Sequence, residues 1–410
     1  TCSDGSEYEG SFVDDLKSGR GTLVEANGST YEGDFEDDLK HGHGKCTLPD
    51  GSEYEGGYVR GEVHGRGRFL ADGDEYEGDW EANVQSGQGR LQYSNGDVYE
   101  GGFQDDMKHG EGVFASADGS EYSGHFEKDL RHGRGTLRSA DGDEYEGDFH
   151  MNMKHGRGRS VSSEGDVYEG MFEADAFHGL GKFEWAGDGS VYEGQYVRGR
   201  AHGSGKYVCP AGSVYVGEWC EDEQTHGRLE FPSGDVYEGT FQDDMRHGFG
   251  TYTSADGSLY EGEWRDDEKS GHGKLTSAGG DTYEGSFLGD MRHGEGVLVC
   301  AGSGDVYEGG FQRDVRHGFG KVTSRDGDVV ECEWENDHHS GPVKLLLSSG
   351  DVYEGGYVDG MKHGDGRVTC AASGDVYEGS FHLDRRHGQG RLTCSDGSEY
   401  EGSFVDDLKS

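Results

Sequence analysis

Proline, aliphatic side chains and long apolar runs are all scarce in this sequence. Only 4 of its 410 residues are proline, and only 30% are hydrophobic. A conventional core for a chain of this length needs more aliphatic bulk, which argues against ordinary globular domains. No run of 18 apolar residues occurs, so the sequence predicts no direct insertion into a membrane.

Basic residues are also in short supply. Lys and Arg total 37 against 83 Asp and Glu, which leaves a formal net charge of -46. Such a chain repels nucleic acid and anionic lipid head groups, and it attracts cations or basic partners. Low hydrophobicity combined with this charge is typical of disorder. Aromatic residues make up 11% of the chain, however, and their regular spacing argues for a fold.

Motifs that mark catalytic or metal sites are missing as well. The sequence contains no GxSxG, Walker loop, dinucleotide-binding fingerprint or HExxH, so we expect no enzyme and no cofactor. Its eight cysteines match no zinc spacing. Cysteines at equivalent places in successive repeats would lie about 10 Å apart, beyond disulfide reach. They are therefore expected to be free thiols or links between separate chains. They are Cys2, Cys46, Cys209, Cys220, Cys300, Cys332, Cys370 and Cys394.

Internal repetition is the main feature of the sequence. A triplet like Tyr-Glu-Gly recurs every 22 to 24 residues, and 392 residues in 17 steps separate the first anchor from the last. The anchors are Tyr8, Tyr31, Tyr54, Tyr76, Tyr99, Tyr122, Tyr145, Tyr168, Tyr192, Tyr215, Tyr237, Tyr260, Tyr283, Tyr307, Val330, Tyr353, Tyr377 and Tyr400. Both halves of each repeat alternate like strands, so each repeat is predicted to form one β-hairpin.

The expected core of a repeat consists of aromatic rings and glycines. In a strand, Tyr31, Gly33 and Phe35 point to one side and Glu32 and Asp34 to the other. Rings that lie across glycines of a neighbouring strand form a thin core from few large side chains. The same core is predicted throughout, for example at Tyr168, Gly170, Phe172, Tyr237, Gly239 and Phe241.

Two kinds of connection join the predicted strands. Pairs such as Asn27-Gly28 and Asp50-Gly51 precede the tyrosine strand, and they are the strongest short-hairpin signal. The other connection, such as 36–40, is acidic and is expected to be longer. Consecutive hairpins should then continue as one meander.

This pattern resembles the MORN-repeat family. The segment 237–241, Tyr-Glu-Gly-Thr-Phe, followed by His-Gly-Phe-Gly at 247–250, is close to the family motif. The resemblance implies an all-β fold: an elongated, twisted, single-layer antiparallel meander of about 17 hairpin repeats, forming a rod. We expect one continuous array over 1–410, with degenerate units near 215–230 and 326–345.

Two longer periods are superimposed on the repeat. Gly-Asp-Val precedes the anchor at intervals of 69 or 70 residues, with the aspartates at 97, 166, 235, 305 and 375, and it also occurs before two other anchors, with aspartates at 328 and 351. This period reflects duplication history, or it presents similar side chains at similar angles around the rod. Residues 393–410 also repeat residues 1–18 letter for letter. Either a recent duplication lies in a longer protein, or the piece comes from a periodic assembly.

Histidines and aspartate pairs are the candidate ligands. In most repeats a histidine stands directly before the first of two closely spaced glycines. Equivalent histidines in successive repeats lie about 9–10 Å apart, which is too far for them to share a zinc ion. Paired aspartates in the acidic connections suggest weak calcium binding, or else a solvated acidic rim. The calcium candidates are Asp14, Asp15, Asp37, Asp38, Asp105, Asp106, Asp243 and Asp244.

These observations support three hypotheses. The first is a structural filament or fibre segment that continues strand to strand beyond both ends, in an extracellular or cell-surface location. Its partners would be copies of itself, end to end or lateral, and other structural proteins. The alternative is a cytoskeletal or ciliary scaffold that docks protein partners along the sheet. A membrane-lipid recruiting module is the third, and the net charge opposes it for anionic lipids.

Overall fold

A computed structural model describes residues 5–410. Every regular element in this range is a β-strand, 36 in all, and the range contains no helix. The predicted all-β fold is confirmed, and the 36 strands slightly exceed two strands for each of the roughly 17 hairpins that were expected. Among the same residues, no helix has the length and apolar character of a membrane span. The thiol expected at Cys2 lies outside the described residues.

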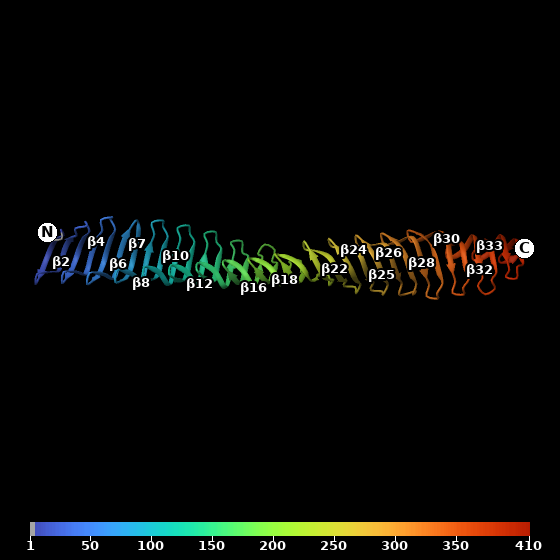
Figure 1. The fold of residues 1–410 in the computed structure, drawn as a ribbon, viewed down its shortest axis with the longest axis horizontal. Coiled ribbons are helices and arrows are strands. Elements are labelled where there is room, and N and C mark those ends of the chain that lie inside the picture. The colour runs from blue at the N-terminus through green and yellow to red at the C-terminus, as the bar shows by residue number, and fades with distance from the viewer. Residues whose placement is uncertain (1–4) are drawn as a thin grey trace. The chain divides into compact units, whose positions relative to one another are not determined.

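The chain divides into two compact units, Thr1–Pro210 (unit 1) and Ala211–Ser410 (unit 2). Within each unit the strands lie side by side in chain order, joined by short connections at both edges (Figure 1). Unit 1 contains β1 (Glu7–Val13), β2 (Leu16–Val24), β3 (Thr30–Glu36), β4 (Leu39–Thr47), β5 (Glu53–Val59), β6 (Glu62–Ala71), β7 (Asp74–Glu81), β8 (Val84–Gln92), β9 (Val98–Gln104), β10 (Met107–Ala115), β11 (Glu121–Glu127), β12 (Leu130–Arg138), β13 (Glu144–His150), β14 (Met153–Val161), β15 (Val167–Glu173), β16 (Ala176–Glu184), β17 (Val191–Val197) and β18 (Arg200–Val208). Unit 2 contains β19 (Val214–Cys220), β20 (Glu223–Glu230), β21 (Val236–Gln242), β22 (Met245–Thr253), β23 (Leu259–Arg265), β24 (Glu268–Thr276), β25 (Thr282–Leu288), β26 (Met291–Val299), β27 (Val306–Gln312), β28 (Val315–Thr323), β29 (Val329–Glu335), β30 (His338–Leu346), β31 (Val352–Val358), β32 (Met361–Thr369), β33 (Val376–His382), β34 (Arg385–Thr393), β35 (Glu399–Val405) and β36 (Leu408–Lys409).

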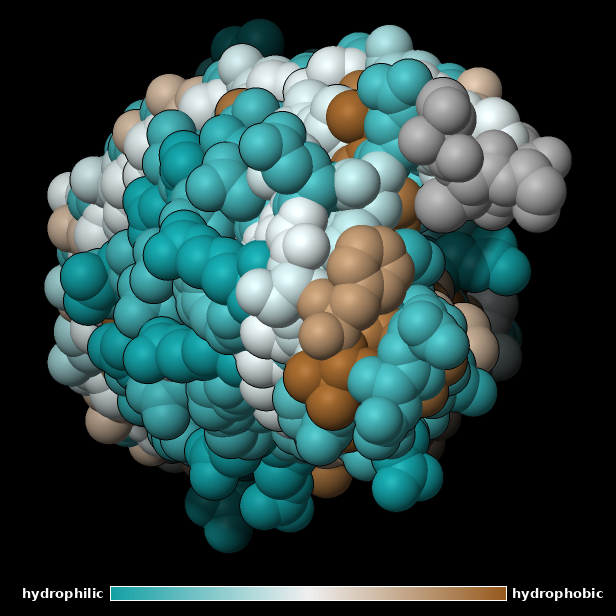
Figure 2. All heavy atoms as spheres, turned by 90° about the vertical axis from the view of Figure 1, so that its left-hand side faces the viewer, coloured by the Kyte–Doolittle hydropathy of each residue, from teal (hydrophilic) through white to brown (hydrophobic). Residues whose placement is uncertain are grey.

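The two faces of each strand differ as the alternation predicts. In β3, Tyr31, Gly33 and Phe35 are buried, while Glu32 and Asp34 are exposed. We call the side of the sheet that carries the tyrosines the tyrosine face, and the opposite side the glutamate face. The core of each unit lies on the tyrosine face, where aromatic rings cover the backbone. Figure 2, which faces the N-terminal end of unit 1, shows hydrophobic side chains gathered in one part and hydrophilic side chains over much of the rest.

The prediction for the two connections was wrong, because their lengths are reversed. The acidic connection between β3 and β4 has only two residues, Asp37 and Asp38, with φ of 49° and 68°. Positive φ at both central residues is the type I′ geometry that matches the twist of a hairpin, and aspartate tolerates it better than most residues. The Asn-Gly connection is the longer one. There Glu25 N–H donates to the Ser29 oxygen at 2.8 Å, and Gly28 has φ of 93°.

A β-bulge explains the first glycine of the His-Gly motif. Between β3 and β4, Gly33 pairs with Gly44 and Phe35 with Lys40, so the three residues 41–43 of β4 lie opposite the single residue Asp34 of β3. Gly42 lies inside this bulge with φ of 67°, in the left-handed region that favours glycine. The bulge accounts for the unequal lengths of the two strands, seven residues in β3 and nine in β4.

The repeat at 215–230 has one glycine fewer in its His-Gly motif than most repeats. Residues 226–229 read His-Gly-Arg-Leu, which by itself suggests that the second glycine is the missing one. In the structure, Gly227 pairs with Gly217 and lies beneath the Tyr215 ring, which is the place of the second glycine. The bulge position is the one that lost a residue, and β20 is accordingly one residue shorter than most strands at its place in the repeat.

The repeat at 326–345 keeps its burial with a different set of side chains. Cys332 pairs with Gly320, and Val343 pairs with Gly355. Both side chains are buried, in places where other repeats have glycine. Because Val330 is much smaller than the tyrosine it replaces, the space that a ring would fill is available to these two side chains.

Candidate interaction surfaces

The tyrosines of the repeat core lie flat across glycine backbone. Tyr168 is buried, and a Cβ added at Gly170 would lie 2.5 Å from its hydroxyl oxygen. The hydroxyl donates a hydrogen bond to the Met171 backbone oxygen at 2.8 Å. Burial raises the pKa of Tyr168 to about 12. These rings are therefore held by packing and a neutral hydrogen bond, in a role that is structural.

The other predicted core residues have the same arrangement. Tyr31 and Tyr237 are fully buried, and their hydroxyls donate to the oxygens of Asp34 and Thr240, each at 2.9 Å. Gly33 and Gly239 are buried and Gly170 is half-buried, while the remaining predicted core residues, Phe35, Phe172 and Phe241, are all buried.

A phenylalanine four residues after an anchor tyrosine links two successive hairpins. The Phe172 ring meets the Tyr168 ring edge to face, with centroids 5.0 Å apart, and it meets Tyr145 of the preceding hairpin at the same distance. Edge-to-face pairs contribute about 0.5–1.5 kcal/mol beyond the area they bury. The rings thus form a ladder along the tyrosine face of the unit.

A row of cations covers this ladder, and the sequence analysis did not anticipate it. Lys154 Nζ lies 4.9 Å from the centre of the Tyr145 ring, and the Arg246 guanidinium lies 4.3 Å from that of Trp264. The signal was present in the sequence, because a Lys or Arg stands nine residues after most anchor tyrosines. The Arg246 guanidinium also donates a hydrogen bond to the backbone oxygen of Asp267, in the tight turn of the next hairpin, at 2.7 Å.

The candidate calcium ligands occupy the tight turns. Asp14–Asp15, Asp37–Asp38, Asp105–Asp106 and Asp243–Asp244 all have positive φ. Asp38 Oδ1 accepts a hydrogen bond from the backbone N–H of Lys17 at 2.8 Å, and Asp106 Oδ1 accepts one from Gln85 at 2.7 Å. In these two turns the second aspartate joins its hairpin to the preceding one. No group of three or more His, Cys, Asp or Glu within 5–410 is arranged to hold a metal ion.

The histidines come closer together than the sequence analysis considered. The His132 and His150 rings are 5.0 Å apart and the His150 and His155 rings 5.7 Å apart. A second trio, His363, His382 and His387, repeats this arrangement in unit 2. The separation of 9–10 Å applies only to the histidines of the His-Gly motifs. The histidines that follow the phenylalanine, His150 and His382, each lie between two of those rings.

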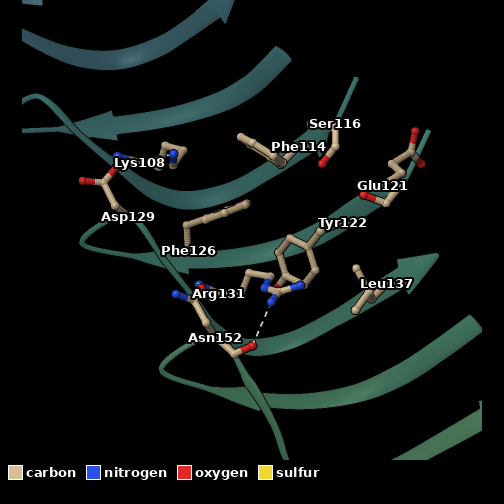
Figure 3. A pocket seen from close by; sticks show the side chains of 11 residues that line it. Lys108, Phe114, Ser116, Glu121, Tyr122, Phe126, Asp129, Arg131, Leu137 and Asn152 are labelled. Carbon is tan, nitrogen blue, oxygen red and sulfur yellow. Dashed lines mark hydrogen bonds and ion pairs between the residues drawn. The ribbon is translucent and has the colours of Figure 1, made fainter. Parts of the chain in front are cut away.

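A hollow on the tyrosine face of unit 1 has a volume of about 290 Å³ (Figure 3). Phe114, Tyr122 and Phe126 lie along it, and Arg131 Nη2 donates to the Asn152 backbone oxygen at 2.9 Å. Rings, a cation and a turn residue are the parts that recur in the other hairpins. The hollow is therefore a feature of the repeating lattice.

The glutamate face is acidic and carries exposed ion pairs between strands. Lys321 Nζ lies 2.9 Å from Glu308 Oε2, and Arg367 Nε lies 3.3 Å from Glu378 Oε1. Exposed pairs of this kind contribute about 0–1 kcal/mol each. Many carboxylates remain on this face, since acidic residues outnumber basic ones by more than two to one.

Comparison with known proteins gives one strong result. A family model described as MORN repeat matches fifteen segments of the chain. They are residues 8–30, 31–53, 54–75, 76–98, 99–121, 122–144, 145–167, 168–190, 192–214, 237–259, 260–282, 283–304, 307–329, 353–373 and 377–399. Residues 215–236 and 330–352 lie outside these segments. No curated protein matches the chain.

Solved structures with some likeness include two TCP-type domains. One is the TCP domain of SAS-4 (dCPAP) of Drosophila melanogaster in complex with a proline-rich motif of Ana2, at 11% identity and a TM-score of 0.27, covering 38% of this chain and 85% of that one. The other is the TCP10 domain of Danio rerio CPAP, at 10% identity and a TM-score of 0.22, covering 66% of this chain and 99% of that one. Scores this low carry no functional argument.

Proposed function

Because the chain belongs to the MORN-repeat family, we propose that it is a repeat-built scaffold that holds other proteins along its open sheet faces. MORN-repeat arrays generally serve as structural or interaction modules. The observation that carries the proposal is the lattice itself. The same tyrosine, glycine and phenylalanine contacts recur from hairpin to hairpin, and each unit is a single layer with two accessible faces.

A repeated lattice suits binding better than catalysis. A catalytic centre needs a distinct pocket with pre-positioned groups, whereas each hairpin here presents nearly the same surface as its neighbours. Repetition instead offers several docking places on one chain, at intervals set by the hairpins. The proposal assigns no catalytic role, and a cytoskeletal or ciliary location suits it.

Simultaneous binding is the test of a scaffold. Proteins cross-linked to the full chain in an extract of its source would be purified and mixed with the chain in pairs. A scaffold forms ternary complexes in analytical ultracentrifugation, in which two partners occupy one chain together. Partners that always displace each other, or a chain that binds no protein, would contradict the proposal.

A fibre is the second candidate, and the identity of residues 1–18 with residues 393–410 favours it. Internal repeats agree far less than this, so the identity suggests a periodic assembly in which copies follow one another strand to strand. An extracellular or cell-surface location suits this candidate. Electron microscopy of native material should then show filaments whose axial repeat corresponds to 17 hairpins. Particles of uniform, limited length would exclude the fibre and leave the scaffold standing.

A further inference from the structure

Two large aromatic side chains project from the glutamate face of unit 2. Phe249 on β22 is 65% exposed and Phe319 on β28 is 61% exposed. Both stand between the two glycines of a His-Gly-Phe-Gly motif, and 70 residues, or three hairpins, separate them. Leu180 of unit 1 stands at the same place of its hairpin, 69 residues before Phe249, and is 66% exposed. Most other hairpins carry polar or charged side chains there.

Each of the two phenylalanines has at least one glutamate beside it on the next strand. Phe249 pairs directly with Glu263 of β23, and Glu261 lies two residues away on the same face. Phe319 pairs with Glu333 of β29 in the same register. Glu261 and Glu263 belong to the first site and Glu333 to the second, and all three side chains are exposed. Each site therefore combines one apolar anchor with at least one exposed carboxylate on the adjoining strand.

We propose that Phe249 and Phe319 are the anchors of two equivalent docking sites for a basic amphipathic helix of a partner protein. The inference rests on the proposed scaffold function, and it names the surface and the partner chemistry. An exposed aromatic side chain within an acidic surface favours a partner that presents an apolar side chain among lysines or arginines. A second copy of this chain is a poor occupant, because each copy carries a formal charge of -46.

The sheet itself favours a helix over an extended segment. The backbone groups of β22 and β28 pair with those of the neighbouring strands, so the glutamate face offers a partner only side chains. An extended segment laid on that face would lose water from backbone groups that find no partner, whereas a helix satisfies its own. Six strand spacings of about 4.8 Å separate the two anchors by about 29 Å. Two helices about 10 Å in diameter can therefore bind at once.

A synthetic helix of 18 residues, with leucines on one side and lysines on the other, is a suitable probe. Isothermal titration calorimetry with the full chain counts the equivalents bound and gives their affinity. Phe249→Ser and Phe319→Ser are each expected to remove one equivalent, or to weaken it by about tenfold or more, and the double variant two. Glu333→Gln should weaken one equivalent and reduce its salt dependence. Circular dichroism confirms that each variant is folded.

Leu288→Ser is the matched control, because Leu288 is also apolar, 59% exposed and in unit 2, but stands beside a tight turn. It should leave the binding unchanged. The inference fails if the double variant binds like the wild type, if the control loses as much, or if a probe with alanines in place of leucines binds equally well. Self-association that the double variant abolishes would identify a second copy as the occupant and overturn it too. Ternary complexes that survive in the double variant would reject these sites while leaving the scaffold function intact.

Discussion

The Phe172 ring packs edge to face against Tyr145 of the preceding hairpin, with ring centroids 5.0 Å apart. Phe172 thus belongs to two hairpins at once, since Tyr168 of its own strand meets its other side at the same distance. A hairpin joined in this way depends on both neighbours, and damage to one ring should spread to the adjacent hairpins first.

Replacing a central tyrosine tests this dependence. Tyr168→Ala removes a buried ring and should lower the free energy of unfolding by about 3–5 kcal/mol. Hydrogen exchange should then rise first in β13–β18, the hairpins around the substitution. Tyr168→Phe keeps the ring and loses only the hydrogen bond to Met171, so its cost should be about 1 kcal/mol. Exchange that rises evenly along the chain would contradict the nearest-neighbour picture.

The repeat at 326–345 offers a test of compensation. Val330→Tyr alone introduces a ring into space that Cys332 and Val343 already occupy, and overpacking of this kind costs about 1–3 kcal/mol. Combining it with Cys332→Gly and Val343→Gly restores the usual arrangement and should recover most of that loss. Thermal unfolding of the single and triple variants measures both effects. A triple variant less stable than Val330→Tyr would show that the three positions are not coupled.

The tight turns should tolerate asparagine but not alanine. Asp38→Ala loses the acceptor for the Lys17 N–H and strains a left-handed residue, at a cost of about 1–2 kcal/mol. Asp38→Asn keeps an acceptor, as Asn152 does at the same place in its own turn, where it accepts from Arg131 N–H at 2.8 Å. Chemical denaturation should therefore rank asparagine close to the wild type. Equal losses for both variants would argue that the negative charge itself is needed.

Acid should weaken the hairpin contacts made by turn aspartates. Burial alone raises the pKa of Asp337, but hydrogen bonds from the backbone N–H and guanidinium of Arg316 outweigh it and lower the pKa overall. A carboxyl whose pKa is lower when folded stabilises the protein above its unfolded pKa, near 3.9, and loses that contribution as the pH falls further. The denaturant concentration at the unfolding midpoint should decrease as the pH is lowered below about 4. It should decrease less steeply in Asp337→Asn. Identical pH profiles for the two proteins would contradict this.

Thiol reactivity should follow burial. Cys220 is exposed, whereas Cys332 is buried, and burial raises the pKa of the Cys332 thiol. A thiol-specific reagent should therefore label Cys220 rapidly in the folded protein and Cys332 only after unfolding, because the thiolate is the reacting species. Mass spectrometry of timed samples separates the two. Rapid labelling of Cys332 under native conditions would show that its repeat opens readily.

The sequence was most informative where one residue type repeats at a fixed interval. The alternation of Tyr31, Gly33 and Phe35 was enough to predict strands, faces and the aromatic core. The connections were harder, because Asn-Gly and Asp-Gly have strong turn preferences in general, while the left-handed conformation of Asp37 and Asp38 depends on the twist of the hairpin they close. Local preference alone therefore assigned the short turn to the wrong edge.

The candidate surfaces were predicted less completely. Phe249 entered the sequence analysis only as part of the family motif, and its exposure becomes evident in the structure, where it pairs with Glu263 on the glutamate face. His150 was passed over because only histidines before a glycine had been aligned. Both cases depend on which residues of neighbouring strands come together, and a single repeat read by itself does not contain that information.

The order of the strands also determines how each unit responds to a pulling force. Because strand order follows chain order, a pull between the first and last strands of a unit acts on the hydrogen bonds of one strand pair after another, rather than on all of them in parallel. Such a lattice opens by peeling at low load. Each released hairpin can pair again with an edge of the same kind, so the opening should be reversible. An array of these hairpins would therefore extend under low force and recover its length when the force is removed. Resistance to stretching would have to come from molecules bound along the array.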